Sequence, residues 1–278
     1  MSSFRERNDR KPRSEHGGKP APDKGLRRGG PRFQPRREDT EGWIWGRHAV
    51  EAALANPDRE GPFRLVASPG AAGPLGDLVA RLGRSVRVEV MELHDLARLL
   101  PQGAVHQGQA LRAPPLEGVG IEDLAASGAG VIVMLDQLTD PQNVGAIFRS
   151  AAAFGAKGVV LQDRNAPQLT GALAKASAGA IETVPCARVV NLSRALEKLA
   201  DLGWRAVGLD GSADTDLDQA LDGRPTVIVM GSEGEGLRRL VAEHCDVLAR
   251  IPMPGGFESL NVSNAAAVAL YEASRPRR

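Results

Sequence analysis

Residues 251–263 read Ile-Pro-Met-Pro-Gly-Gly-Phe-Glu-Ser-Leu-Asn-Val-Ser, and an alanine-rich segment follows them. The prolines and the glycine pair favour a turn, whereas the alanines are strong helix formers. Ser and Asn at the start of a helix accept hydrogen bonds from its unpaired backbone N–H groups, or use the same atoms to hold a ligand. This third block, as we call residues 251–263, therefore predicts a polar loop that leads into a helix over residues 262–272.

From residue 131 onward, short apolar runs alternate with helical patterns. The candidate strands are residues 131–135, 158–161, 183–185, 206–209, 227–230 and 247–251. The candidate helices are residues 144–154, 169–177, 192–202, 237–244 and 262–272. Such alternation predicts an α/β fold in which helices cover both faces of a parallel sheet. Ligands of an open sheet of this kind bind at the carboxyl ends of the strands.

A first block, residues 136–149, reads Asp-Gln-Leu-Thr-Asp-Pro-Gln-Asn-Val-Gly-Ala-Ile-Phe-Arg and follows a predicted strand. Asn143 is placed to cap the helix expected from residue 144, because Asn is a preferred N-cap residue. Arg149 lies six residues further on, nearly two helical turns along. The residues alone predict a helix cap and a surface arginine.

A second block, residues 231–236, reads Gly-Ser-Glu-Gly-Glu-Gly and follows an apolar strand. It lacks the Lys-Ser/Thr ending of a phosphate loop and the spacing of a dinucleotide fingerprint. Its carboxylates would repel phosphate groups and favour a cationic ligand that carries no phosphate. Gly231 allows close approach of the backbone to a ligand. Glu235 is predicted to stabilise the dipole of the helix that follows.

The N-terminal third of the chain differs in composition. Residues 1–40 hold twelve Lys or Arg against six Asp or Glu, while the remaining residues hold 23 against 28. This Pro/Gly/Arg-rich tail is predicted to be disordered, and it serves either as an RNA-binding arm or as a solubilising extension. Residues 41–112 predict a small α/β domain, residues 113–127 a linker with paired prolines, and residues 128–278 the main domain.

Composition excludes several classes of protein. The 278 residues are 42% apolar but only 4% aromatic, so two domains with aliphatic cores are expected. No apolar run reaches the ~18 residues of a membrane helix, and the N-terminus does not resemble a signal peptide. The two cysteines and five histidines show no metal-ligand spacing. We therefore expect a cytoplasmic protein that binds neither a membrane nor a metal.

The three blocks, in this order, resemble the SpoU/TrmH (SPOUT) family of RNA ribose 2′-O-methyltransferases. The resemblance is strong over residues 130–272, moderate over 43–112, and absent from the tail. It implies a deep trefoil knot in the C-terminal domain, a substrate-binding domain ahead of it, S-adenosylmethionine as cofactor, RNA as substrate and a homodimer.

The resemblance also implies roles for individual residues. The implied catalytic residues are Asn143, Arg149, Glu233, Ser259 and Asn261. The implied cofactor-binding residues are Gly231, Glu233, Gly234, Ile251, Met253, Leu260 and Asn261. Arg149 either deprotonates the 2′-hydroxyl, as has been proposed for the family, or holds an RNA phosphate and polarises the hydroxyl. The second role suits a guanidinium better, because this group normally stays protonated.

Residues 106–108, His-Gln-Gly, and the form of the second block resemble the branch of the family that methylates a guanosine in 23S ribosomal RNA. Two alternatives stay open. One is a transfer RNA 2′-O-methyltransferase of the same family. The other is a non-catalytic RNA-binding protein that serves ribosome assembly, which is disfavoured because all four of the most telling implied residues are present. These four are Asn143, Arg149, Glu233 and Asn261.

Overall fold

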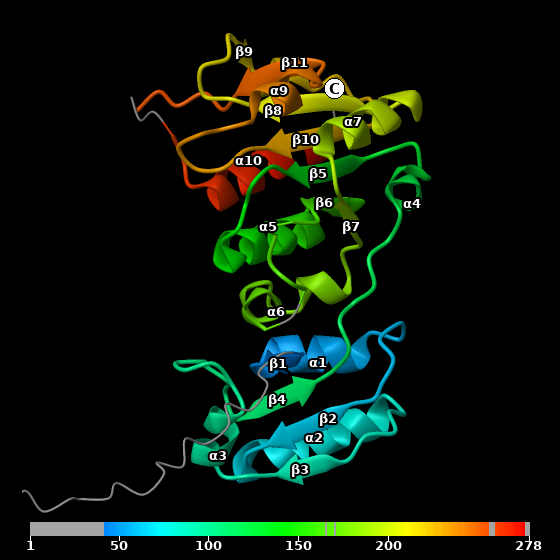
Figure 1. The fold of residues 1–278 in the computed structure, drawn as a ribbon, viewed down its shortest axis with the longest axis vertical. Helices are drawn as coiled ribbons and strands as arrows, with labels where there is room; N and C mark the ends of the chain where they lie inside the picture. Colours follow the sequence, from blue (N-terminus) through cyan, green and yellow to red (C-terminus); the bar gives the residue numbers. More distant parts are fainter. Residues whose placement is uncertain (1–41, 165, 170, 256–258, 276–278) are drawn as a thin grey trace, which may run out of the picture. The chain divides into compact units, whose positions relative to one another are not determined.

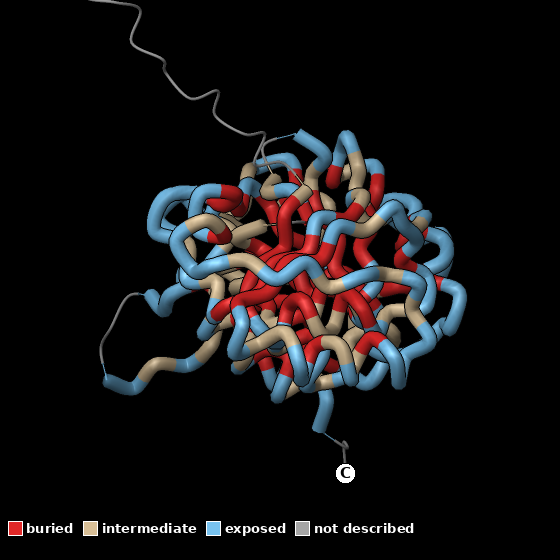
Figure 2. Tube along the Cα trace, turned by 90° about the horizontal axis from the view of Figure 1, so that it is seen from below, coloured by how far each residue is buried: buried red, intermediate tan, exposed pale blue. Residues whose placement is uncertain are grey.

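The computed structural model describes residues 42–164, 166–169, 171–255 and 259–275. The tail predicted over residues 1–40 lies outside these described residues. Strands of the described part form two sheets, one of four strands and one of seven (Figure 1). Figure 2 shows that buried positions gather inside an outer layer of exposed turns. No helix among the described residues is long and apolar enough to cross a bilayer.

The N-terminal domain is built on the four-stranded sheet, whose strand order is β1-β4-β2-β3. β4 runs antiparallel to β1 and to β2, whereas β2 and β3 are parallel. Aliphatic side chains and two tryptophans fill the core, and the Arg64 guanidinium lies 5.7 Å from the centre of the Trp43 ring. The strands are β1 (Trp43–Trp45), β2 (Arg64–Ala67), β3 (Val88–Val90) and β4 (Gln109–Arg112). The helices are α1 (Arg47–Ala55), α2 (Pro69–Arg81) and α3 (Leu93–Arg98).

The seven-stranded sheet is parallel throughout, with strand order β7-β6-β5-β10-β8-β11-β9. Its strands are β5 (Val131–Leu135), β6 (Gly158–Gln162), β7 (Cys186–Val189), β8 (Arg205–Leu209), β9 (Thr215–Asp216), β10 (Thr226–Met230) and β11 (Val247–Arg250). The α-helices are α4 (Ile121–Ala125), α5 (Pro141–Ala153), α6 (Ala172–Ala176), α7 (Leu192–Asp201), α8 (Leu217–Ala220), α9 (Arg239–Glu243) and α10 (Val262–Ser274), and η1 (Ala180–Glu182) is a 3-10 turn.

Alternation along the strands explains how helices cover both faces of this sheet. Val133 of β5 belongs to the core cluster that contains residues of α5, α8 and α10, whereas its neighbour Ile132 belongs to the cluster formed with α4, α7 and α9. Successive side chains of a strand point to opposite faces, so an apolar run buries residues on both. The predicted α/β fold with a covered parallel sheet is confirmed, and the trefoil knot stays a prediction.

Three local predictions differ from the structure. Residues 183–185 are not a strand, because the N–H groups of Thr183 and Val184 donate to Ala180 in the turn that closes η1. The segment 113–127, predicted as a linker, contains α4, whose Leu124 is buried in the core. The helix α5 begins at Pro141, three residues earlier than the apolar pattern indicated.

A buried ion pair joins the N-terminal domain to the large-sheet domain. Arg59 donates from Nη2 to Glu182 Oε1 over 2.8 Å and from Nε to Oε2 over 3.0 Å, and Asn56 Nδ2 donates to the same Oε2 over 3.0 Å. The two charged side chains are 2% and 1% exposed. Nearby, Gln107 Oε1 accepts hydrogen bonds from Arg47 N and Lys175 Nζ, so the His-Gln-Gly segment also contacts α6.

We expect Glu182→Ala to destabilise the protein by about 3–5 kcal/mol, because it leaves the Arg59 guanidinium buried without its partner. Urea unfolding followed by circular dichroism measures the change. Glu89→Ala is the matched control, since the Arg64–Glu89 pair is 42% and 45% exposed and should contribute less than about 1 kcal/mol. Equal losses from the two variants would contradict this assignment.

Candidate functional site

A cavity of about 660 Å³ lies at the carboxyl ends of β8, β10 and β11, where ligands of parallel sheets bind. We call it the large cavity. The loops after these three strands and the residues ahead of α10 form its walls. Every residue that the resemblance implies for cofactor binding lines it: Gly231, Glu233, Gly234, Ile251, Met253, Leu260 and Asn261.

The glycines of the second block allow a tight loop at the edge of this cavity. A Cβ on Gly231 would lie 2.0 Å from the carbonyl carbon of Gly236, so no larger residue fits there without moving the backbone. The Gly236 N–H donates to the Ser232 carbonyl over 3.0 Å, which closes the loop. The helix α9 begins at Arg239, so Glu235 lies in the loop and cannot support a helix dipole as predicted.

A hydrogen-bonded cluster brings all three blocks together. Glu233 Oε1 accepts from Asn261 Nδ2 over 2.6 Å, from Val262 N over 3.1 Å and from Asn143 Nδ2 over 3.3 Å. Asn261 Nδ2 also donates to Asn143 Oδ1 over 3.0 Å. Asn261 additionally caps α10, because its Oδ1 accepts from Ser263 N. The carboxylate of one loop thereby holds the first turns of two helices, α5 and α10, in fixed positions.

Asn143 does not cap a helix, contrary to the sequence-based prediction. The N-cap of α5 is Asp140, whose side chain accepts from Gln142 N over 3.0 Å. Asp followed by Pro at the first helical position is a strong start signal, and it outweighs the apolar pattern that begins at Val144. The Asn143 amide is therefore available to the cluster.

Arg149 lies apart from this cluster. Six helical residues separate it from Asn143, which corresponds to about 9 Å along the axis and about 120° around it. Its side chain is exposed and lines no cavity that we identified in the described part of the chain. It forms no hydrogen bond or ion pair with any described residue. The structure thus gathers Asn143, Glu233 and Asn261, with Ser259 on the cavity wall, but not Arg149.

One interaction of a buried carboxylate at the site is not predicted by any motif. Asp136 is fully buried and accepts from Arg238 N over 2.9 Å and from Arg238 Nε over 2.8 Å. Arg238 Nη2 also donates to Gln162 Oε1 over 3.3 Å. An acidic residue directly after a buried strand was the available signal for Asp136, whereas nothing in the sequence singled out Arg238.

The remaining titratable groups do not suggest covalent or metal chemistry at this site. Burial raises the pKa of the Cys186 thiol to about 12. The pKa of Cys245 also rises to about 12, mainly through burial and further through the charges of Asp246 and Asp136. Neither thiol supplies a thiolate near neutral pH. Among the described residues no group of His, Cys, Asp and Glu is arranged to hold a metal ion.

Two family models match the chain. Residues 130–271 match the SpoU rRNA Methylase family, and residues 43–119 match the model described as RNA 2'-O ribose methyltransferase substrate binding. The first match includes all the residues of the cluster and of the large cavity.

Curated relatives are similar over much of the chain. An uncharacterized tRNA/rRNA methyltransferase of Mycolicibacterium gilvum is 47% identical over 201 residues, which cover 70% of this chain and 63% of that protein. A protein of the same description from Mycolicibacterium vanbaalenii is 47% identical over 190 residues, covering 66% and 60%. The chain therefore spans less than two thirds of the length of the curated relatives it matches.

Solved structures share the fold over both domains. The SpoU methyltransferase AviRb from Streptomyces viridochromogenes, in complex with the cofactor AdoMet, superposes with a TM-score of 0.69 at 27% identity over 84% of this chain and 88% of that one. A structure described as an RNA 2'-O ribose methyltransferase gives a TM-score of 0.64 at 27% identity over 83% and 86%.

We expect Gly231→Ala to lower the free energy of unfolding by about 1–3 kcal/mol, because the added methyl group meets backbone atoms rather than a flexible side chain. Thermal unfolding measures this loss. Gly76→Ala is the control, since a Cβ there meets nothing within 4 Å and Ala is the better helix former inside α2. A Gly231→Ala protein as stable as Gly76→Ala would show that the loop does not need a glycine.

Proposed function

The chain belongs to the SpoU rRNA Methylase family, and from this premise we propose that it transfers a methyl group from S-adenosylmethionine to a ribose 2′-hydroxyl of RNA. The observation that carries the proposal is the position of the Asn143–Glu233–Asn261 cluster at the wall of the large cavity. A donor pocket and a set of fixed polar groups thereby meet at one place.

The large cavity suits S-adenosylmethionine in size and chemistry. Its volume of about 660 Å³ falls within the usual range of ~300–1,000 Å³ for small-molecule sites. The carboxylates of Asp210, Glu233 and Glu235 line it, and they favour a ligand that carries a sulfonium and an ammonium group without phosphates. Apolar side chains of Met253 and Leu260 offer surface to an adenine ring. The AdoMet complex of AviRb supports the same ligand.

The bound cofactor supplies an electrophilic methyl group, so the protein has to align and polarise the attacking hydroxyl. Alignment alone can supply much of the rate. Three N–H groups fix Glu233 Oε1, and no described residue donates to Glu233 Oε2, which is left to accept a hydrogen bond from a ligand. We assign Ser259 and the Asn143 amide to holding the ribose at the cavity wall, and Asn261 to positioning Asn143 and Glu233.

We further propose that Arg149 acts in the site of a second copy within a homodimer. A guanidinium that stays protonated can hold an RNA phosphate and polarise the 2′-hydroxyl, but Arg149 lies far around α5 from the cluster of its own chain. The exposed face of α10 supports a dimer, because Val268 and Tyr271 lie 42% and 55% exposed on it. The Tyr271 ring packs edge-on against Phe154, with the ring centres 5.9 Å apart.

For the substrate we favour a guanosine of 23S ribosomal RNA, the target of RlmB, which is the branch of the family that residues 106–108 and the second block resemble. The match of residues 43–119 to a substrate-binding model supports a dedicated RNA-binding domain. A transfer RNA target stays the first alternative, since the curated relatives are described as tRNA/rRNA methyltransferases. We rank a non-catalytic assembly factor below both methyltransferase alternatives, because all three residues of the Asn143–Glu233–Asn261 cluster are present and hydrogen-bonded.

We expect purified protein to transfer label from S-adenosylmethionine to 23S RNA, and Arg149→Ala to lower kcat by at least about 10²-fold while cofactor binding is kept. Arg194→Ala, an exposed arginine on α7, should retain full activity. Label found only in transfer RNA would support the proposed methyl transfer but identify transfer RNA, and not 23S RNA, as the substrate. Absence of label and of cofactor binding would favour the assembly-factor alternative.

Coexpression of Arg149→Ala with Glu233→Gln tests the contribution of a second copy. If Arg149 serves the partner site, half of the dimers are mixed and each has one site with both groups intact, so about a quarter of the sites are active. Activity should therefore recover to about a quarter of the wild-type value. Activity that stays at the level of the single variants would place Arg149 in the site of its own chain.

A further inference from the structure

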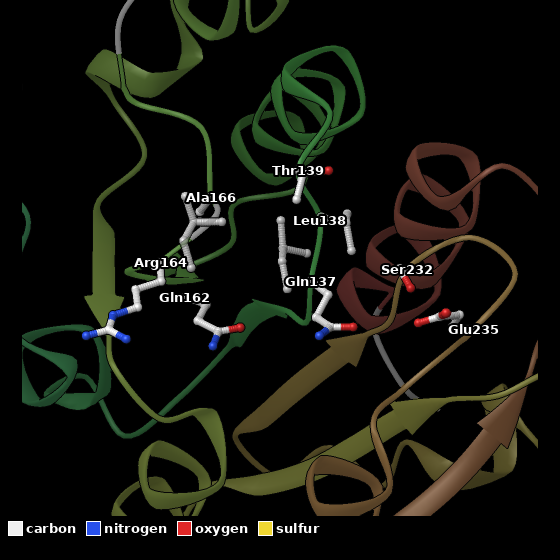
Figure 3. A pocket seen from close by; sticks show the side chains of 10 residues that line it. Gln137, Leu138, Thr139, Gln162, Arg164, Ala166, Ser232 and Glu235 are labelled. Carbon is white, nitrogen blue, oxygen red and sulfur yellow. The ribbon is translucent and has the colours of Figure 1, made fainter.

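A second cavity, of about 460 Å³, lies beside the large one at the carboxyl ends of β5 and β6. Leu135, Leu138 and Leu161 form an apolar part of its lining. Ser232 and Glu235 line both cavities, so the two share a wall in the glycine loop. In Figure 3 the Gln137 amide and the Glu235 carboxylate point toward each other across this second cavity.

Several polar side chains of the second cavity have no partner within the described residues. Gln137, Thr139, Ser232 and Glu235 form no side-chain hydrogen bond or ion pair there. Gln137 also has φ 58°, a left-handed backbone conformation that is strained for a residue other than glycine. Strain of this kind persists where the surrounding structure enforces it, and it is common at ligand sites. Gln137, Thr139 and Glu235 are exposed and Ser232 is half-buried, so these side chains are accessible to bond a ligand that enters the cavity.

We propose that the second cavity takes the base of the nucleotide whose ribose is methylated, and that it selects guanine. The inference rests on the proposed function, since it assigns the large cavity to the methyl donor. An unpaired base is read by hydrogen bonds to its Watson–Crick edge, with its faces against apolar or aromatic side chains. Because the cavities share a wall, a base held in one directs its ribose toward the other.

The choice of guanine follows from Glu235. A carboxylate accepts hydrogen bonds through two oxygens. The Watson–Crick edge of guanine presents two adjacent donors, N1–H and the N2 amino group, and so matches both oxygens. Adenine and cytosine each place a ring-nitrogen acceptor beside their amino donor, and uracil flanks its single N–H with carbonyl groups. A carboxylate facing those acceptors is repelled.

Gln162 and Arg164 complete the recognition. Arg238 donates to Gln162 Oε1, and Asp136 holds Arg238, so the Gln162 NH₂ group remains as a donor for the guanine O6. In Figure 3 the Arg164 guanidinium points away from the other labelled side chains. At this position it suits a phosphate of the RNA backbone, a contact that orients the strand without reading its sequence.

The test uses two variants of the full chain, Glu235→Gln and Thr139→Phe, with Glu117→Gln as the matched control. Glu117 is exposed and lines neither cavity. After the methylated position is mapped with the wild-type protein, kcat/KM is compared on RNA fragments with guanosine or inosine there. Inosine lacks the N2 amino group. Binding of S-adenosylhomocysteine, measured by calorimetry, reports the large cavity separately and shows that each variant is folded.

We expect the wild-type protein to prefer guanosine over inosine by about 10–100-fold and Glu235→Gln to lose most of that preference. Thr139→Phe should fill the second cavity and abolish methyl transfer while S-adenosylhomocysteine affinity stays within about twofold. Glu117→Gln should change neither quantity.

Three results would overturn the inference while the proposed chemistry stands. These are methylation of a nucleotide other than guanosine, an unchanged guanosine preference in Glu235→Gln with full activity in Thr139→Phe, and a loss of S-adenosylhomocysteine affinity in Thr139→Phe that parallels its loss of activity. The last result would make the second cavity part of the donor site. A wild-type protein that binds S-adenosylhomocysteine but methylates no RNA would instead refute the proposed function, and the inference with it.

Discussion

The site depends on one acceptor atom, Glu233 Oε1. It accepts from Asn143 and Asn261, which lie 90 and 28 residues away along the chain, and from the Val262 N–H at the start of α10. One loop and the first turns of two helices, α5 and α10, are joined through this atom. Without it, each of these segments would need to be positioned separately, at a cost of conformational entropy. Glu233 Oε1 therefore fixes both the wall of the large cavity, through Asn261 and Val262, and the nearby Asn143 amide.

An ion pair between a buried carboxylate and a partly exposed guanidinium fixes further loops of the site. Asp136 directly follows β5 and holds Arg238, which precedes α9 and also bonds Gln162 at the end of β6. Burying the Asp136 carboxylate is costly, and the backbone and guanidinium N–H groups of Arg238 satisfy it, while the Arg238 side chain stays 40% exposed. The shared wall between the cavities thus begins and ends at fixed points, Gly231 packed on Gly236 and Arg238 bound to Asp136.

The sequence predicted what repeats along the chain and missed what depends on tertiary contact. Alternation located β5 with its exact bounds and the start of α10, because burial on both faces forces continuous apolar runs. It missed β9, since a two-residue strand has no period. The motifs located the large cavity. The second cavity was not predicted, because Gln137, Gln162 and Glu235 line one cavity only when the end of β6 and the loops after β5 and β10 meet.

The charges suggest how an acidic site receives a polyanion. Residues 41–278 hold 23 Lys or Arg against 28 Asp or Glu, and Asp210, Glu233 and Glu235 line the large cavity. Phosphates are repelled from such a cavity, so under the proposed function the ribose approaches it while the base enters the second cavity. The RNA backbone would then follow cations outside both cavities, and the exposed Arg164 is one such cation. Repulsion within and attraction outside would together orient the 2′-hydroxyl toward the donor, which is the alignment that methyl transfer requires.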